Sequence, residues 1–115
     1  MINRAVLSLV KELKQASKKN KAPLWAKLAN LALKPSSSMR VVNLTRIDKV
    51  TKNDDVLIVP GKVLGTGNIS HKITLCSFSI STTAAKKIIK SGGKIIRSSD
   101  MIQKYPTGKG VMLIG

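Results

Sequence analysis

The sequence is short of acidic residues. Asp and Glu number 5 against 21 Lys and Arg, so the formal net charge at pH 7 is +16. Such an excess repels itself in a folded chain unless a polyanion neutralises it, which points first to nucleic acid and second to an anionic membrane surface. Hydrophobic residues make up 43% of the chain, as in a globular protein, which excludes a disordered basic tail.

Aromatic residues are also few, since Trp25, Phe78 and Tyr105 are all that the chain contains. This scarcity argues against a protein that reads RNA by stacking bases on aromatic side chains. We expect any nucleic-acid contact to run through Lys and Arg to phosphate groups instead. Trp25 falls on the apolar stripe of a predicted helix, so we expect it in the core.

Cysteine and histidine occur once each, as Cys76 and His71. A single cysteine excludes an internal disulfide and fits a reducing compartment such as the cytoplasm. Two ligands cannot build a structural zinc site, so we expect no metal and no cofactor. A Cys–His catalytic pair is the alternative, but no third orienting group is apparent. A cysteine within an apolar run is typical of an inert buried thiol.

Long hydrophobic runs are missing too. No apolar stretch approaches the ~20 residues that a membrane-spanning helix needs, and the N-terminus lacks the apolar core of a signal peptide. At 115 residues, the chain is long enough for one domain with a substantial hydrophobic core. We therefore expect a single cytoplasmic domain over residues 1–115.

The chain begins with two predicted helices, which form a helical part over residues 1–35. Apolar residues recur at helical spacing over residues 3–17, and Pro23 suits the first turn of a second helix over residues 24–33. A basic loop is expected between them, over residues 17–21. The lysines of this region form a cationic strip predicted to contact RNA: Lys14, Lys18, Lys19 and Lys21.

Residues 36–115 alternate between short strands and short helices, which predicts an α/β fold with helices packed against an irregular sheet. The expected strands cover residues 39–42, 56–59, 72–80, 94–97 and 111–114. The expected helices cover residues 44–50, 84–90 and 98–105. Within these helices we expect Val50 and Ile89 to face inward and Lys87 to face solvent.

The most informative stretch is LIVPGKVLGTG, residues 57–67. Its apolar half predicts a buried strand ended by a turn at Pro60-Gly61, because proline cannot donate to a sheet ladder. Gly65 and Gly67 leave backbone N–H groups accessible, so the loop could hold a phosphate beside Lys62. Taken alone, the glycines favour a tight turn between two strands over a ligand loop, and they match neither the Walker pattern nor the dinucleotide fingerprint.

Asn43 and Arg46 form a second candidate anion site. Asn43 is predicted to cap the helix that follows it, and helix N-termini attract negative charge. A cap without any ligand explains the same residues equally well.

Two segments, VNLTRI at residues 42–47 and VPGKVLGTG at residues 59–67, closely resemble large-subunit ribosomal protein eighteen-e, a family of archaea and eukaryotes. Trp25, the Lys34-Pro35 break and the GKGV segment near the C-terminus are similar as well. The resemblance implies a relative of the universal large-subunit protein fifteen, built on an irregular repeat of two strands and a helix. It also implies a structural, non-catalytic role on ribosomal RNA beside neighbouring ribosomal proteins. Family members often carry additional arginines where this chain has three serines, at residues 36–38.

We therefore expect large-subunit ribosomal RNA to bind one surface that combines basic side chains with the glycine loop. Its predicted residues are Lys34, Arg40, Asn43, Arg46, Lys62, Gly65, Thr66, Gly67 and Lys72. Two other functions remain open, namely a nucleotide-binding enzyme that uses residues 61–67 and a basic membrane-surface protein. The enzyme lacks a general base or metal carboxylate close in sequence, and the membrane protein lacks the Trp and Phe partners of interfacial helices.

Overall fold

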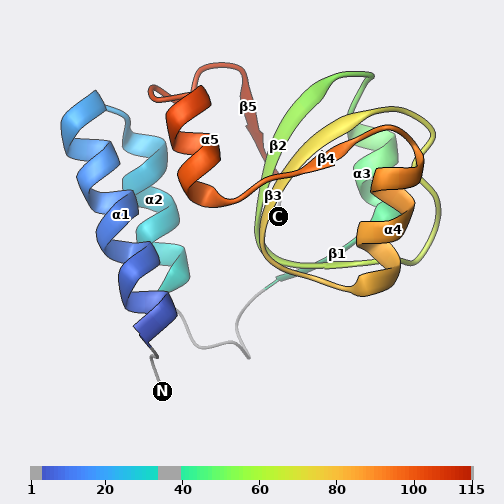
Figure 1. Ribbon diagram of the computed structural model, residues 1–115, viewed down its shortest axis with the longest axis horizontal. Helices are drawn as coiled ribbons and strands as arrows, with labels where there is room; N and C mark the ends of the chain where they lie inside the picture. Colours follow the sequence, from blue (N-terminus) through green and yellow to red (C-terminus); the bar gives the residue numbers. More distant parts are fainter. Residues whose placement is uncertain (1–3, 34–39, 115) are drawn as a thin grey trace. The chain divides into compact units, whose positions relative to one another are not determined.

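A computed structural model describes residues 4–33 and 40–114 (Figure 1). The elements in chain order are α1 Arg4–Asn20, α2 Pro23–Ala32, β1 Arg40–Asn43, α3 Leu44–Val50, β2 Asp55–Leu64, β3 Ile73–Ile80, α4 Thr82–Lys90, β4 Lys94–Ile95, α5 Ser98–Lys104 and β5 Val111–Leu113. The predicted α/β class is confirmed.

The chain divides into two compact units. The first combines the residues up to 39 with residues 98–110, and the second combines residues 40–97 with residues 111–115. Helix α5 therefore belongs with α1 and α2, although it is distant from them in the sequence. The predicted boundary after residue 35 falls outside the described residues.

The helical unit is organised around Trp25. This side chain is 1% exposed, and its indole N–H donates to the carbonyl oxygen of Pro106 at 2.7 Å. Leu13 of α1 and Leu28 of α2 are buried to a similar degree, as the apolar periodicity of both helices predicts. The prediction that Trp25 is a core residue is confirmed.

Helix α1 runs further than expected. It continues to Asn20, and Lys21 alone then takes a left-handed conformation with φ of +51°. The amide of Ala22 donates to the carbonyl of Ser17 at 3.0 Å, which closes the helix end in the manner of a Schellman motif. The predicted loop over residues 17–21 is therefore wrong. Lysine is a good helix former, and no glycine or proline stops the helix earlier.

The second unit is built on a sheet whose central strand is β2, and every pairing between its described strands is parallel. Strand β3 lies on one side of β2 and is followed by β4. On the other side, β1 pairs with the second half of β2 and β5 pairs with the first half. Parallel strands bring their carboxyl ends to the same edge of the sheet.

Strand β2 passes straight through Pro60 and Gly61, so the predicted turn there is wrong. The register between β2 and β3 shifts between Val59 and Lys62, which marks a β-bulge. A bulge tolerates a proline because the ladder is already interrupted. Gly61 faces Arg40 of β1, whose carbonyl oxygen would collide with any Cβ at that position. The glycine permits close strand pairing rather than a chain reversal.

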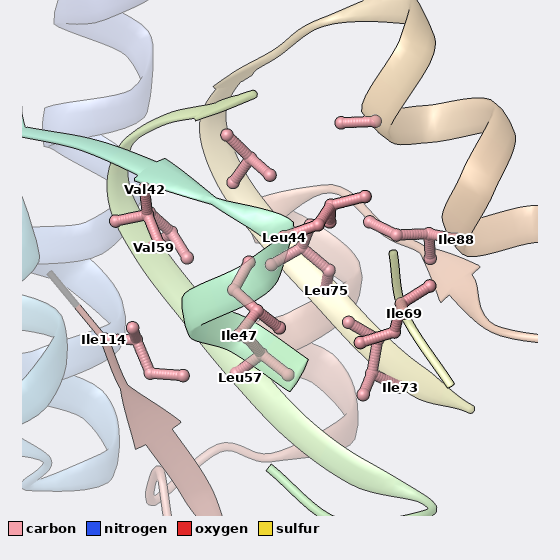
Figure 2. Packing of buried hydrophobic residues seen from close by; sticks show 12 residues of the cluster. Val42, Leu44, Ile47, Leu57, Val59, Ile69, Ile73, Leu75, Ile88 and Ile114 are labelled. Atoms are coloured by element: carbon pink, nitrogen blue, oxygen red, sulfur yellow. The ribbon is translucent and has the colours of Figure 1, made fainter. Parts of the chain in front are cut away.

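The core of the second unit lies between one face of this sheet and the helices α3 and α4 (Figure 2). The cluster includes Leu44, Ile47, Leu57, Val59, Ile73, Leu75, Ala84 and Ile88, each at most 1% exposed. The expectation that Val50 and Ile89 face inward is wrong, since they are 43% and 62% exposed. Each residue of a helix turns about 100°, so Ile89 points away from the direction taken by Ile88.

Candidate nucleic-acid interface

The carboxyl ends of β1, β2 and β3 lie together at one edge of the sheet. Asn43 pairs with Leu64, and Val63 pairs with Ile80, so the three strands end at matching heights. The N-termini of α3 and α4 and the glycine loop, residues 65–67, follow directly from these ends. The carboxyl edge of a parallel sheet is where α/β folds commonly bind ligands.

Basic side chains gather beside β1. Arg40 and Arg46, both exposed, line a hollow of about 400 Å³ together with Val41 and Val42. Val41 is the register partner of Lys62, which is also exposed. Arg40 and Arg46 therefore share one hollow, and Lys62 lies on the strand beside it, on the face that Val41 exposes. Because the guanidinium of arginine matches phosphate oxygens in a bidentate manner, this arrangement suits a phosphate backbone.

Asn43 occupies the N-cap position of α3 with the extended backbone expected of a cap. Its side chain nevertheless makes no capping hydrogen bond. The amide of Thr45 instead donates to the carbonyl of Thr66 at 3.2 Å. The glycine loop thus supplies an acceptor to the first turn of α3, and the prediction that the Asn43 side chain caps this helix is wrong.

Lys87 of α4 forms two hydrogen bonds to carbonyl groups of the glycine loop. Its ammonium nitrogen donates to the carbonyl oxygens of Gly65 and Gly67, each at 2.7 Å. The side chain is half-buried, so the expectation that Lys87 faces solvent is wrong. No sequence signal distinguishes this lysine from Lys86 and Lys90 on the same helix, since only the path of the loop gives it two acceptors.

Both glycines of the loop are required by their surroundings. A Cβ on Gly65 would lie 2.7 Å from Cγ2 of Thr83 at the start of α4. Gly67 has φ of +90°, and a Cβ there would collide with Oγ1 of Thr45. The interpretation that steric constraint requires these glycines is confirmed, but the expected tight turn is wrong, since β2 and β3 are parallel and residues 65–72 connect them. Contact of the glycines with a ligand stays a prediction.

The remaining predicted residues lie elsewhere. Lys72 directly precedes β3, whereas Lys62 pairs with Ser79 near the other end of that strand. Seven residues of strand span about 23 Å, so Lys72 lies at the opposite edge of the sheet from Lys62. The single surface expected from the sequence is therefore divided. Lys34 falls outside the described residues, and the exposed lysines of the helical unit include Lys14, Lys18, Lys19 and Lys21.

A polar cluster connects α3 to the segment before β3. The amide and hydroxyl of Ser70 donate to Oδ1 of Asp48 at 2.9 and 2.7 Å, and these bonds lower the pKa of Asp48 from its ordinary value of 3.8. Nδ1 of His71 lies 3.4 Å from the same oxygen, and its Nε2 lies 2.7 Å from Oγ1 of Thr51. The set contains Ser, His and Asp, but the Ser70 hydroxyl donates to the carboxylate. A serine nucleophile would donate to the histidine instead, so this geometry does not activate Ser70.

Two features of the described chain bear on the alternatives. Within residues 4–33 and 40–114, no group of three or more His, Cys, Asp or Glu side chains could hold a metal ion. None of the helices in those residues is long and apolar enough to cross a membrane.

Comparison with known proteins decides the family. The model of a ribosomal protein family, whose description names 50S-L15, 50S-L18e and a counterpart from the 60S subunit, matches residues 10–96. The chain belongs to this ribosomal protein family. Three relatives are each named large ribosomal subunit protein eL18. That of Sulfurisphaera tokodaii is 41% identical over 106 residues, which cover 92% of this chain and 90% of the relative.

The second relative, from Archaeoglobus fulgidus, is 35% identical over 112 residues, which cover 97% of this chain and 96% of the relative. The third, from Pyrobaculum aerophilum, is 34% identical over 112 residues, which cover 97% of this chain and 92% of the relative. The resemblance deduced from residues 42–47 and 59–67 is confirmed. In this family member the two segments lie side by side, since β1 pairs with the second half of β2.

Proposed function

We propose that this chain is a structural constituent of the large ribosomal subunit and that it binds ribosomal RNA chiefly through one defined surface. We call it the carboxyl-end surface, and it comprises Arg40, Asn43, Arg46, Lys62, Gly65, Thr66 and Gly67. A family of ribosomal proteins implies a structural role rather than an enzymatic one, and a place in the cytoplasm, where ribosomes work.

The observation that supports the RNA site is a hollow lined by Arg40 and Arg46, beside which Lys62 pairs with Val41. Each cation that neutralises a phosphate releases counterions from the RNA, which supplies much of the binding free energy. Val41, at 56% exposed, adds an apolar floor against which a ribose can pack. The hollow of about 400 Å³ is large enough to receive a phosphate with its attached sugar.

The lysine strip on α1 provides a second contact in this proposal. Its four members, Lys14, Lys18, Lys19 and Lys21, are all exposed. Lys72 lies at the opposite edge of the sheet from Lys62, so in this proposal the two lysines contact different parts of the RNA. A +16 chain needs phosphates on more than one face, because neutralising the carboxyl-end surface alone leaves most of the charge uncompensated.

The nucleotide-binding alternative finds no support in the loop. A Walker loop directs backbone N–H groups and its lysine at the same phosphates, whereas Lys62 lies within β2 before the loop and Lys87 binds carbonyl oxygens of the loop. Neighbouring large-subunit proteins are the second class of partner that we propose, in keeping with the names of the relatives.

The test compares two double variants with the same change of charge. Arg46→Glu with Lys62→Glu alters the carboxyl-end surface, and Lys27→Glu with Lys104→Glu alters exposed lysines of α2 and α5 that the proposal does not place on the RNA. Binding to large-subunit ribosomal RNA is measured over a series of salt concentrations. We expect the first variant to bind about 100-fold more weakly, with a salt slope lower by about 2, and the second to lose about tenfold less affinity.

Equal losses of RNA affinity in the two double variants would contradict the carboxyl-end surface as the RNA site. Binding of the RNA by the parent chain would still support the proposed ribosomal function. A parent chain that fails to bind this RNA above a general polyanion would contradict the function itself. Retention on large subunits through a high-salt wash provides the second measurement, because an assembled component is held by shape as well as by charge.

A further inference from the structure

The two bonds from Lys87 determine how the glycine loop presents its backbone. The ammonium group has three N–H donors, and two of them bind the carbonyls of Gly65 and Gly67 at 2.7 Å each. The carbonyl oxygens of Gly65 and Gly67 are thereby directed at the same nitrogen atom. The carbonyl between them, that of Thr66, accepts from the amide of Thr45 at 3.2 Å.

The orientation of the carbonyls fixes that of the amides. In a planar trans peptide the N–H points opposite to the C=O, and the described backbone contains no cis peptide bond. The amides of Thr66 and Asn68 belong to the same peptide planes as the carbonyls of Gly65 and Gly67. Both amides therefore point away from the Lys87 nitrogen, and they diverge from each other because the two carbonyls converge on it.

These two amides are available for a ligand. Neither donates a hydrogen bond to another group in the described part of the chain, and Thr66 and Asn68 are both exposed. The two amides are separate donors, each of which can bind an anionic oxygen. The sugar–phosphate backbone of RNA offers such oxygens in series, so each amide can donate to a different one.

We infer that Lys87 is a positioning residue, which turns the amides of Thr66 and Asn68 outward, toward phosphate oxygens along the RNA backbone. The inference rests on the proposed function and adds an uncharged backbone contact to the carboxyl-end surface. Lys87 does not contact the RNA in this inference. It acts through its hydrogen bonds to the carbonyls of Gly65 and Gly67.

The test replaces Lys87 by Met and compares it with the same change at Lys86. Lys86 is exposed on the same helix, so Lys86→Met removes an equal charge without touching the loop. Affinity for large-subunit ribosomal RNA is measured over a salt series, and unfolding is followed thermally. In parallel, the backbone amides of the ¹⁵N-labelled proteins are observed by NMR during titration with a short RNA oligonucleotide.

We expect Lys87→Met to bind the RNA about tenfold more weakly than Lys86→Met, with similar salt slopes, because the additional loss comes from hydrogen bonds rather than charge. The amides of Thr66 and Asn68 should shift on titration in the parent and not in Lys87→Met. Lys87→Arg, which can still donate to both carbonyls, should recover part of the affinity.

Equal affinities of Lys87→Met and Lys86→Met would overturn the inference, whatever the change in thermal stability. Unshifted amides of Thr66 and Asn68 in an RNA-bound parent would overturn it as well. A parent that binds no ribosomal RNA would instead refute the proposed function, so the two failures are distinguishable.

Discussion

Replacing Trp25 by Phe tests how the helical unit holds two distant parts of the chain together. The indole N–H reaches the carbonyl of Pro106, which lies 81 residues away in the sequence, at 2.7 Å. Phenylalanine keeps an aromatic ring in the core but has no donor. The change therefore removes this hydrogen bond together with part of the packing around a side chain that is 1% exposed.

The expected loss in the free energy of unfolding is about 2–3 kcal/mol. A hydrogen bond of this kind contributes about 1 kcal/mol net, and the Pro106 carbonyl is left without its donor. The smaller ring removes buried apolar surface and leaves a small gap, which costs about 1–2 kcal/mol more. A loss of this size is a substantial fraction of the stability of a typical domain, about 5–15 kcal/mol.

The assay is urea unfolding followed by circular dichroism, because Trp25 is the single tryptophan and its fluorescence disappears with the substitution. Lys27→Ala is the matched control, since Lys27 is exposed on the same helix and alanine favours helices. The control should stay within about 0.5 kcal/mol of the parent. A Trp25→Phe protein as stable as the control would refute the reasoning, and a loss well above about 3 kcal/mol would mean that the indole supports more than this bond.

Two further changes test the second unit. Gly65→Ala places a Cβ 2.7 Å from the Thr83 side chain, and urea unfolding should show a loss of about 1–3 kcal/mol from overpacking, whereas unchanged stability would contradict the packing argument. Bonds from Ser70 lower the pKa of Asp48, so the ionised carboxylate stabilises the fold above the ordinary pKa of 3.8, and this stabilisation is lost as the pH falls through the lowered value. Asp48→Asn should accordingly show a flatter decline of unfolding free energy between about pH 6 and about pH 2, and parallel curves for parent and variant would argue against it.

The helices and the long strands were predictable because their signals are local. Pro23 opens α2, and the cap at Ser81 accepts from the amide of Ala84, both as the side-chain chemistry requires. The error at the centre of the sheet occurred where tertiary contact overrides the local signal. Pro60-Gly61 is typical of a turn, yet β1 and β3 pair on either side of it and carry β2 through a bulge.

The candidate site was predictable only in part, and for the same reason. Arg46 and Lys62 could be grouped from the family motifs, and strand pairing does bring their segments together. Lys72 could not be separated from them, because its distance depends on the direction in which β3 runs. Lys87 had no distinguishing sequence pattern, since its role comes from the two carbonyls that the loop brings to its nitrogen.

The contrast between Lys87 and its neighbours shows why net charge alone is a poor guide to an RNA site. Of the three lysines on α4, Lys87 binds backbone carbonyls within the fold, while Lys86 and Lys90 are exposed. The contribution of Lys87 to affinity should therefore depend on geometry and resist added salt, whereas that of the exposed lysines should fall as salt rises. A surface that combines both kinds of lysine can retain specific contacts under conditions in which general attraction to RNA has been screened.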